Sequence, residues 1–149
     1  MDVNIRQVRL EDIEELVELC ELHATYERAE YISEGKVEAL KQILFSPKPV
    51  LFCLVAVQSN HLLGYVTLTK EFSTWDAKYF AHMDCLYVRD SARGQGVGSL
   101  LMTKIQAYAV ELGCSQMQWQ TPKDNLRAID FYKTRGAQAK HKLRFFLSL

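Results

Sequence analysis

The sequence predicts an α/β fold with one mixed β-sheet and helices on both of its faces. Three observations support this prediction. Apolar residues recur at helical spacing in several segments, apolar runs typical of strands lie between these segments, and a Ser59-Asn60 turn joins two of the runs directly. The predicted order is strand, helix, helix, three strands, helix, strand, helix and a terminal strand region. We therefore expect about six to seven strands flanked by about four helices.

The first half of the chain is predicted to contain two helices and an antiparallel hairpin. Apolar residues after Leu10 recur at helical spacing, and Pro47 and Pro49 end a second helix because proline cannot continue one. A continuous apolar run then predicts a buried strand, which the Ser59-Asn60 turn connects to an alternating one. The expected elements are a strand at 3–8, a helix from about 10 to 20, a helix at 34–45, and strands at 50–57 and 62–69.

The second half is predicted to alternate strands with two helices. Gly113 is expected to end the first of these helices, and Asp124 or Asn125 to cap the second, which Gly136 ends. Pro122 separates this last helix from the strand before it. The expected elements are strands at 79–88 and 117–121, helices at 97–112 and from about 125 to 134, and one or two short strands in the tail that includes 143–147.

The composition is that of one compact domain. The chain has 149 residues, of which 48% are hydrophobic and 24% charged, enough to bury a core without disulfides or metals. Lys and Arg number 18 and so do Asp and Glu, so no net positive charge attracts nucleic acid. We expect a single domain over residues 1–149 that has no nucleic-acid partner.

No segment indicates a membrane or a metal. The four cysteines are isolated from one another in apolar surroundings, which is typical of reduced core thiols, and the four histidines are scattered rather than clustered as zinc ligands are. The first residues lead directly into a strand-like alternation, and no apolar run approaches membrane-spanning length. We expect a cytoplasmic protein with no metal and no membrane partner.

A glycine-rich loop, Arg93-Gly94-Gln95-Gly96-Val97-Gly98, separates a predicted strand from a predicted helix. Glycines let backbone N–H groups approach an anion without a Cβ in the way, and the helix start adds unpaired amides and its positive dipole end. The loop is therefore typical of a pyrophosphate site, although an ordinary strand-to-helix turn can have the same composition. The spacing excludes a P-loop, which needs a Lys-Ser/Thr pair, and a dinucleotide fingerprint, because Ser99 replaces its third glycine.

The loop and a second motif together resemble the GCN5-related N-acetyltransferase (GNAT) family. The first motif is Arg93-x-x-Gly96-x-Gly98 after a strand, and the second comprises Asn125, Ala128, Phe131-Tyr132 and Gly136. Both occur in the family's order, with the expected strand and helix between them, and the resemblance covers essentially the whole chain. It implies the GNAT fold and transfer of an acetyl group from the cosubstrate acetyl-coenzyme A (acetyl-CoA) to a primary amine.

The resemblance also implies which residues hold the coenzyme. A strand backbone is expected to pair with the pantetheine arm as an added strand would, and the N–H of Leu86 to polarise the acetyl oxygen. Asn125 is expected both to cap its helix and to contact the coenzyme. A homodimer is a further expectation from the family. The implied coenzyme-binding residues are Leu86, Tyr87, Val88, Arg93, Gly94, Gln95, Gly96, Val97, Gly98, Ser99, Asn125, Ala128 and Tyr132.

Within the family, several stretches resemble the diamine or polyamine acetyltransferases. These stretches are Thr25-Tyr26-Glu27, Trp75, and residues 83–88, 94–99, 114–117 and 131–137. The sequence departs from that pattern where Asp84 replaces a glutamate and Cys85 an aspartate, and in a shorter tail. The matching stretches imply a small cationic amine as the acceptor.

Two residues are candidates for the proton transfers of the reaction. An alkylammonium has a pKa of about 10.4 and must lose a proton before it attacks a thioester, and the departing thiolate must gain one. Tyr132 is the candidate general acid, because the family places its tyrosine beside the coenzyme sulfur; the alternative is a core tyrosine. Asp84 is the candidate base, acting directly or through one water, and its alternative is an inert partner of a nearby basic residue.

The acceptor site is predicted where the first helix ends. Tyr26, Glu27 and Glu30 combine an aromatic ring with carboxylates, which suits a cationic amine, although an exposed acidic helix end has the same composition. Trp75 precedes the strand that carries Asp84 and is expected to form the opposite wall. The substrate-binding set is thus Tyr26, Glu27, Glu30, Trp75 and Asp84.

Two alternatives to this function stay open on the sequence alone. The acceptor could be a protein N-terminus, a lysine or an aminoglycoside, since acidic walls suit several amines. The chain could also be a regulatory module that binds coenzyme without turnover, against which the presence of Tyr132 argues.

Overall fold

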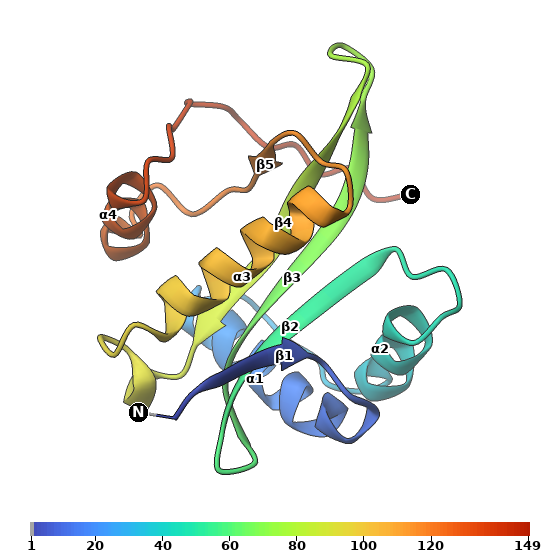
Figure 1. Cartoon of the computed structure of the whole chain (residues 1–149), viewed down its shortest axis with the longest axis vertical. Coiled ribbons are helices and arrows are strands. Elements are labelled where there is room, and N and C mark those ends of the chain that lie inside the picture. The colour runs from blue at the N-terminus through green and yellow to red at the C-terminus, as the bar shows by residue number, and fades with distance from the viewer. Residues whose placement is uncertain (1) are drawn as a thin grey trace. The chain divides into compact units, whose positions relative to one another are not determined.

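The computed structural model describes residues 2–149 and divides into two compact units (Figure 1). The first unit is Met1–Trp119 and contains the whole β-sheet, and the second is Gln120–Leu149 and contains one helix.

The sheet of the first unit has five strands in the order in which they occur along the chain. The first four pair antiparallel with their neighbours, and the last pairs parallel with the fourth. Parallel pairing requires a crossover, which here contains a helix. The strands are β1 (Asn4–Gln7), β2 (Leu51–Gln58), β3 (His61–Ser73), β4 (Lys78–Val88) and β5 (Met117–Gln118).

Helices pack on both faces of this sheet. Figure 1 shows α3 (Val97–Glu111) crossing in front of the strands and α1 (Ile13–Tyr26) behind them, while α2 (Lys36–Leu44) packs beside α1 and β2. Cys53 and Val55 of β2 belong to the core that α1 covers, whereas Leu101 and Ile105 of α3 are fully buried. The apolar run at 50–57 is continuous because both faces of β2 are covered.

One buried carboxylate fixes the start of α1, the helix that carries the predicted acceptor residues. Asp12 accepts two hydrogen bonds from the Arg6 guanidinium, at 2.6 and 3.0 Å, and a third from the Arg9 N–H at 2.7 Å. Burial opposes the charged carboxylate, but these hydrogen bonds outweigh it and lower the pKa of Asp12 below its ordinary value. The entry of α1 is thereby tied to β1.

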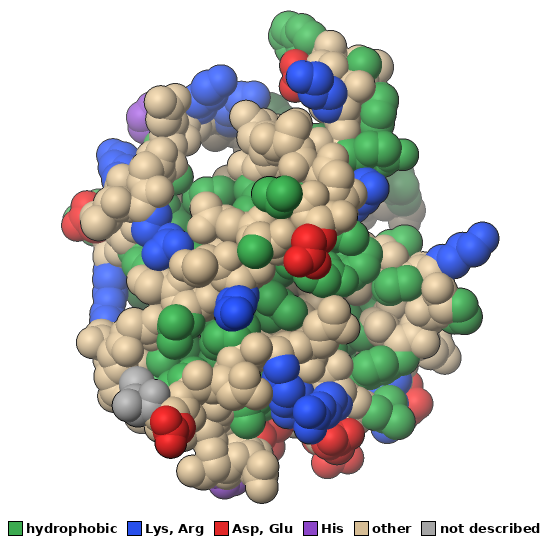
Figure 2. Space-filling model, viewed as in Figure 1, with side chains coloured by type: hydrophobic (Ala, Val, Ile, Leu, Met, Phe, Trp, Pro, Cys, Tyr) green, Lys and Arg blue, Asp and Glu red, His purple; other side chains and the backbone are tan. Residues whose placement is uncertain are grey.

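The second unit consists of α4 (Leu126–Thr134) and a tail without regular secondary structure. The Asn125 side chain accepts a hydrogen bond from the Ala128 N–H at 3.3 Å, and Gly136 follows the helix at a φ of 92°, so both predicted helix signals are confirmed. Figure 2 shows Lys and Arg side chains gathered over this unit. The Lys and Arg residues of this unit are Lys123, Arg127, Lys133, Arg135, Lys140, Lys142 and Arg144.

The mixed sheet and the helices are confirmed, but three strand predictions are wrong. The sheet has five strands rather than six to seven, β5 is confined to two residues of the expected 117–121, and residues 137–149 form no strand. Leu143, Phe145 and Leu147 are instead more than four-fifths exposed. Apolar composition favours a strand only where a neighbouring strand supplies hydrogen-bond partners, and this tail has none among the described residues.

Within residues 2–149, no helix combines the length and apolar character needed to cross a bilayer. Over the same residues, no three His, Cys, Asp or Glu side chains are grouped as metal ligands would be. The prediction of one domain over 1–149 stays a prediction.

Gly64→Ala is expected to lower the free energy of unfolding by about 3 kcal/mol, because its Cβ would lie 2.5 Å from the Tyr87 carbonyl oxygen and 3.2 Å from the Val88 Cα. These are main-chain atoms of β4, so relieving the steric overlap would disturb the hydrogen bonds between β3 and β4. Gly35→Ala is the control. It has a left-handed φ of 76° but no described atom within 4 Å of its Cβ, and we expect a loss of about 1 kcal/mol. Equal losses in chemical denaturation would contradict the steric explanation.

Candidate functional site

The glycine-rich loop leads directly into α3 and presents main-chain N–H groups at the start of that helix. Gly94 and Gly96 have left-handed φ values of 76° and 84°, and a Cβ on either would meet no described atom within 4 Å. Gly96 is the N-cap residue and supplies no side-chain cap, so the first-turn amides of α3 keep their hydrogen-bonding capacity. With the positive end of the helix dipole, this arrangement suits an anion such as a diphosphate.

The Arg93 side chain anchors this loop to the sheet and to α1. Its Nε donates to the Val88 carbonyl oxygen at 2.9 Å, and its guanidinium forms an ion pair with Asp90. The guanidinium carbon also lies 4.3 Å from the Tyr26 ring centroid and 5.3 Å from that of Tyr87. Arg93 was predicted to bind the coenzyme, and the structure places its guanidinium among these protein groups.

Strand β4 contains a bulge at the predicted base. Thr67 of β3 pairs with Cys85 and Leu68 pairs with Met83, which leaves Asp84 as the extra residue. The Cys85 N–H donates to the Thr67 hydroxyl at 3.1 Å, and the Asp84 side chain is exposed and accepts from the Cys85 thiol at 3.6 Å. A bulge re-aims side chains and interrupts the ladder, and bulges are frequent beside active sites.

Beyond the bulge, β4 parts from β5. The two strands pair only at Ala81 and His82, so residues 83–88 have no ladder partner on that side in the part of the chain that the structure describes. The main chain of Leu86, Tyr87 and Val88 can therefore accept an extended ligand as an added strand. This is the arrangement predicted for the pantetheine arm.

The end of α1, which carries the predicted acceptor residues Tyr26 and Glu27, meets β4 near the bulge. The Tyr26 and Tyr87 ring centroids are 6.4 Å apart. Glu27 Oε2 lies 2.8 Å from His23 Nε2, and the His23 ring stacks on Tyr87 with centroids 5.2 Å apart. His23 Nδ1 lies 3.0 Å from the Tyr65 hydroxyl. The end of α1 and the strands β3 and β4 therefore share one group of contacts.

His23 was not among the site residues predicted from the sequence. Its four-residue spacing to Glu27 on one helix was the available signal, because side chains at i and i+4 lie on the same face. Its second partner, Tyr65, is 42 residues away along the chain and only the fold brings it close.

Burial governs the titration of this group. It lowers the pKa of His23 below 6.5, with Arg93 acting in the same direction, while the charges of Glu27 and Asp84 oppose the shift. Burial also raises the pKa of Tyr65, and it raises the pKa of Cys85 to about 12, so the phenol and the thiol keep their protons at neutral pH. The site thus contains a neutral imidazole that contacts the Glu27 carboxylate and lies within the electrostatic influence of Asp84.

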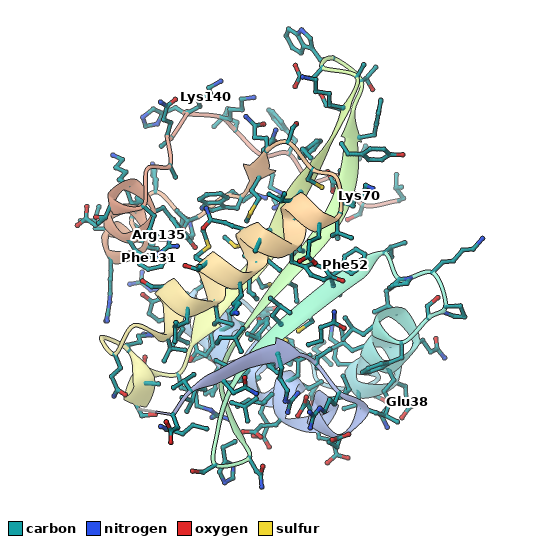
Figure 3. All side chains as sticks on the ribbon, viewed as in Figure 1. Glu38, Phe52, Lys70, Phe131, Arg135 and Lys140 are labelled. Atoms are coloured by element: carbon teal, nitrogen blue, oxygen red, sulfur yellow. The ribbon has the colours of Figure 1, made fainter. Side chains whose placement is uncertain are left out.

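Other predicted residues lie apart from this group or in the second unit. Trp75 is at the turn between β3 and β4 with a 97% exposed side chain, and Glu30 is exposed in the segment after α1. Tyr132 lies on α4, where its ring meets Phe131 edge-on with centroids 5.5 Å apart (Figure 3 labels Phe131). Asn125 and Ala128 form the cap of that helix. The roles predicted for these residues stay predictions.

Comparison with known proteins identifies the family. Residues 13–137 match the model of the Acetyltransferase (GNAT) family. This chain belongs to the GNAT family. It is an acetyl-transferring enzyme, as its resemblance implied, and the family uses acetyl-CoA.

Two relatives of this GNAT enzyme and one solved structure with the same fold illustrate the range of amines for which such proteins are named. The enzyme is 32% identical over 144 residues to thialysine N-epsilon-acetyltransferase of Bos taurus. The aligned region covers 91% of this chain and 84% of that relative. The enzyme is 28% identical to the peptidyl-lysine N-acetyltransferase YjaB of Salmonella typhimurium, over 91% of this chain and 83% of the relative. An aminoglycoside N-acetyltransferase, AAC(6')-Iy, solved with CoA, matches its fold with a TM-score of 0.83 and 17% identity, over 99% of this chain and 95% of that structure.

Gly96→Val is expected to weaken CoA binding by about tenfold, because a side chain at the N-cap of α3 obstructs the approach of an anion to the amides. Gly113→Val is a matched control at the other end of the same helix, since both glycines have a φ of 84° and no described atom within 4 Å of an added Cβ. Titration calorimetry measures the CoA affinity of each variant. Thermal unfolding measures the loss of stability that a left-handed valine causes in both. Equal CoA affinities in the two variants would contradict the prediction that the glycine-rich loop binds the diphosphate of CoA.

Proposed function

We propose that this enzyme transfers the acetyl group of acetyl-CoA to a primary amine of a small cationic acceptor, diamine-like or amino-acid-like, by direct attack. The observation that carries the proposal is the placement of the Glu27 carboxylate and the Tyr26 ring, at the end of α1, against Tyr87 of β4. The proposal places acceptor and coenzyme on either side of the β4 bulge.

The charges around the bulge support a cationic acceptor. Glu27 and Asp84 come from different elements, yet both raise the pKa of the His23 imidazole, so their negative potentials overlap there. One face of Tyr26 is already occupied by the Arg93 guanidinium. The carboxylates, rather than the ring, therefore supply most of the attraction for an ammonium group.

The comparisons support the size of the acceptor. The relative named for thialysine matches this chain over 91% of its length, and thialysine is a small amino acid with a terminal primary amine. The relative named for peptidyl-lysine supports the second candidate, a lysine within a protein, because the reacting amine is chemically the same. The two acceptors differ in the chain that surrounds the amine.

The proposed mechanism assigns one residue to each proton transfer. Asp84 removes a proton from the acceptor ammonium through one ordered water, and the free amine attacks the thioester carbonyl. The N–H of Leu86 stabilises the negative charge on the oxygen, which can contribute about 3 kcal/mol. The C–N bond forms, the attacking nitrogen releases its second proton through the same water to solvent, and the C–S bond breaks. Tyr132 gives its proton to the thiolate of CoA and regains one from solvent. A phenol and a thiol, with ordinary pKa values of about 10 and about 8.5, are well matched for this transfer.

The acceptor is tested with a panel assay that follows release of free CoA thiol. The panel contains 1,4-diaminobutane, thialysine, a lysine-containing peptide, a peptide with a free N-terminus and an aminoglycoside. Turnover of the first two in preference to the rest supports the proposal, and selective turnover of either peptide or of the aminoglycoside would overturn it. A homodimer, which the family resemblance implies, is part of the same proposal, as is the cytoplasmic location expected from the sequence. Sedimentation of the purified chain tests the dimer.

Tyr132→Phe is expected to reduce kcat by about 100-fold, because the thiolate loses its proton donor. CoA affinity is expected to change by less than about twofold, since the ring remains. Tyr108→Phe is the control, because that tyrosine packs on Phe52 within the first unit, with centroids 5.6 Å apart (Figure 3 labels Phe52). A kcat of Tyr132→Phe close to that of the control would eliminate the proposed acid.

Glu27→Gln is expected to raise the KM for cationic acceptors by about tenfold, because the amide keeps the shape of the side chain but not its charge. Glu38→Gln on α2 is the control, since its carboxylate lies 3.8 Å from the Lys41 ammonium of the same helix (Figure 3 labels Glu38). Steady-state kinetics at saturating acetyl-CoA measure both constants. A KM unchanged for every cationic acceptor would place the acceptor site elsewhere.

A further inference from the structure

His23 is a half-buried histidine on which three structural elements converge, and the mechanism above does not use it. Its side chain is 15% exposed. Glu27 binds Nε2 from the same helix, Tyr65 binds Nδ1 from β3, and Tyr87 of β4 stacks on the ring. Both ring nitrogens and one ring face therefore have partners.

The hydrogen bonds define which nitrogen carries the proton. A carboxylate only accepts hydrogen bonds, so Nε2 must donate to Glu27. Nδ1 of the neutral ring then accepts from the Tyr65 hydroxyl, which can donate because burial raises its pKa. The neutral imidazole is thereby satisfied at both nitrogens, and it fixes one carboxylate oxygen of Glu27. In the part of the chain described here, His23 is the ion-pair partner of that carboxylate through Oε2, which leaves Oε1 for an ammonium group.

We propose that His23 is a positioning residue for the acceptor: it holds the Glu27 carboxylate toward the acceptor's ammonium group, and it weakens their attraction when it takes up a proton. This inference rests on the proposed function, since it assumes that Glu27 binds the acceptor. A neutral imidazole leaves the negative charge of Glu27 intact. An imidazolium at 2.8 Å neutralises that charge and repels a cationic acceptor.

The direction of the pH effect follows from the groups that face the ring. Burial lowers the pKa of His23, the carboxylates of Glu27 and Asp84 raise it, and the Arg93 guanidinium lowers it further, with a net result below 6.5. Tyr65 and Tyr87, which contact the ring, are uncharged at neutral pH because burial raises the pKa of each. The same holds for the thiols of Cys20 and Cys85, which interact with Tyr65. The acceptor KM is therefore expected to be lowest above about pH 6.5 and to rise as the pH falls and His23 gains a proton.

The first experiment measures acceptor KM against pH, with thialysine and 1,4-diaminobutane as probes, for the wild type, His23→Gln and His23→Leu. Glutamine can place an amide N–H close to the position of Nε2 and cannot be protonated, whereas leucine fills space without a hydrogen bond. Between about pH 7.5 and about pH 5, the wild-type KM is expected to rise about fivefold and that of His23→Gln less than about twofold. His23→Leu is expected to have a KM about tenfold higher than wild type at the upper pH.

CoA affinity and kcat separate this role from a merely structural one. Both are expected to stay within about twofold of wild type in His23→Gln at the upper pH, since the residue acts through Glu27. If His23→Gln keeps the full acidic rise in KM, or if His23→Leu binds the acceptors as the wild type does, the inference is wrong.

A second experiment does not depend on turnover. The imidazole of His23 is titrated by NMR in the wild type and in Glu27→Gln, where the midpoint is expected to be lower because a charge that favours the imidazolium is gone. Equal midpoints would overturn the inference whatever the acceptor. If instead Glu27→Gln shifts the midpoint but leaves every acceptor KM unchanged, the proposed acceptor site is wrong and the coupling of the pair stands.

Discussion

The contact of Arg93 with Tyr26 and Tyr87 is the interaction on which the site depends. One guanidinium touches the end of α1, the end of β4 and the start of the glycine-rich loop, and its Nε bonds the Val88 carbonyl oxygen. A partly desolvated cation–π contact contributes up to about 2 kcal/mol, and here two rings share one cation. Because the same side chain contacts the loop and the helix end, a displacement of one changes the position of the other.

The rest of the site is made largely from main chain. The first turn of α3 has amides without side-chain caps, the bulge at Asp84 turns β4 away from a regular ladder, and β5 pairs with only the first part of β4. Amides and strand edges bind a diphosphate and an extended pantetheine arm without contacts from particular side chains. A backbone-built site of this kind is compatible with different acceptors, and proteins with this fold carry names of quite different amines.

The local parts of the structure could be predicted from the sequence because their causes are local. Helical spacing of apolar residues predicted α1 and α3, left-handed φ values at Ser59 and Asn60 fit the predicted hairpin turn, and the caps at Asn125 and Gly136 formed as expected. The strand predictions for the tail failed because a strand needs a partner, and β-like composition at 143–147 carries no information about one. The prediction that β5 extends over 117–121 failed for the same reason.

The sequence by itself determined the family, the order of the helices and the first four strands, and the glycine-rich loop, since short-range spacing and backbone freedom specify these. Only the tertiary structure decided that Arg93 packs against Tyr26, that Asp84 is the bulged residue, and that His23 joins Glu27 to Tyr65. Each of these depends on strand register and on how α1 lies on the sheet. Register and packing come from contacts between distant segments, which no local pattern of residues encodes.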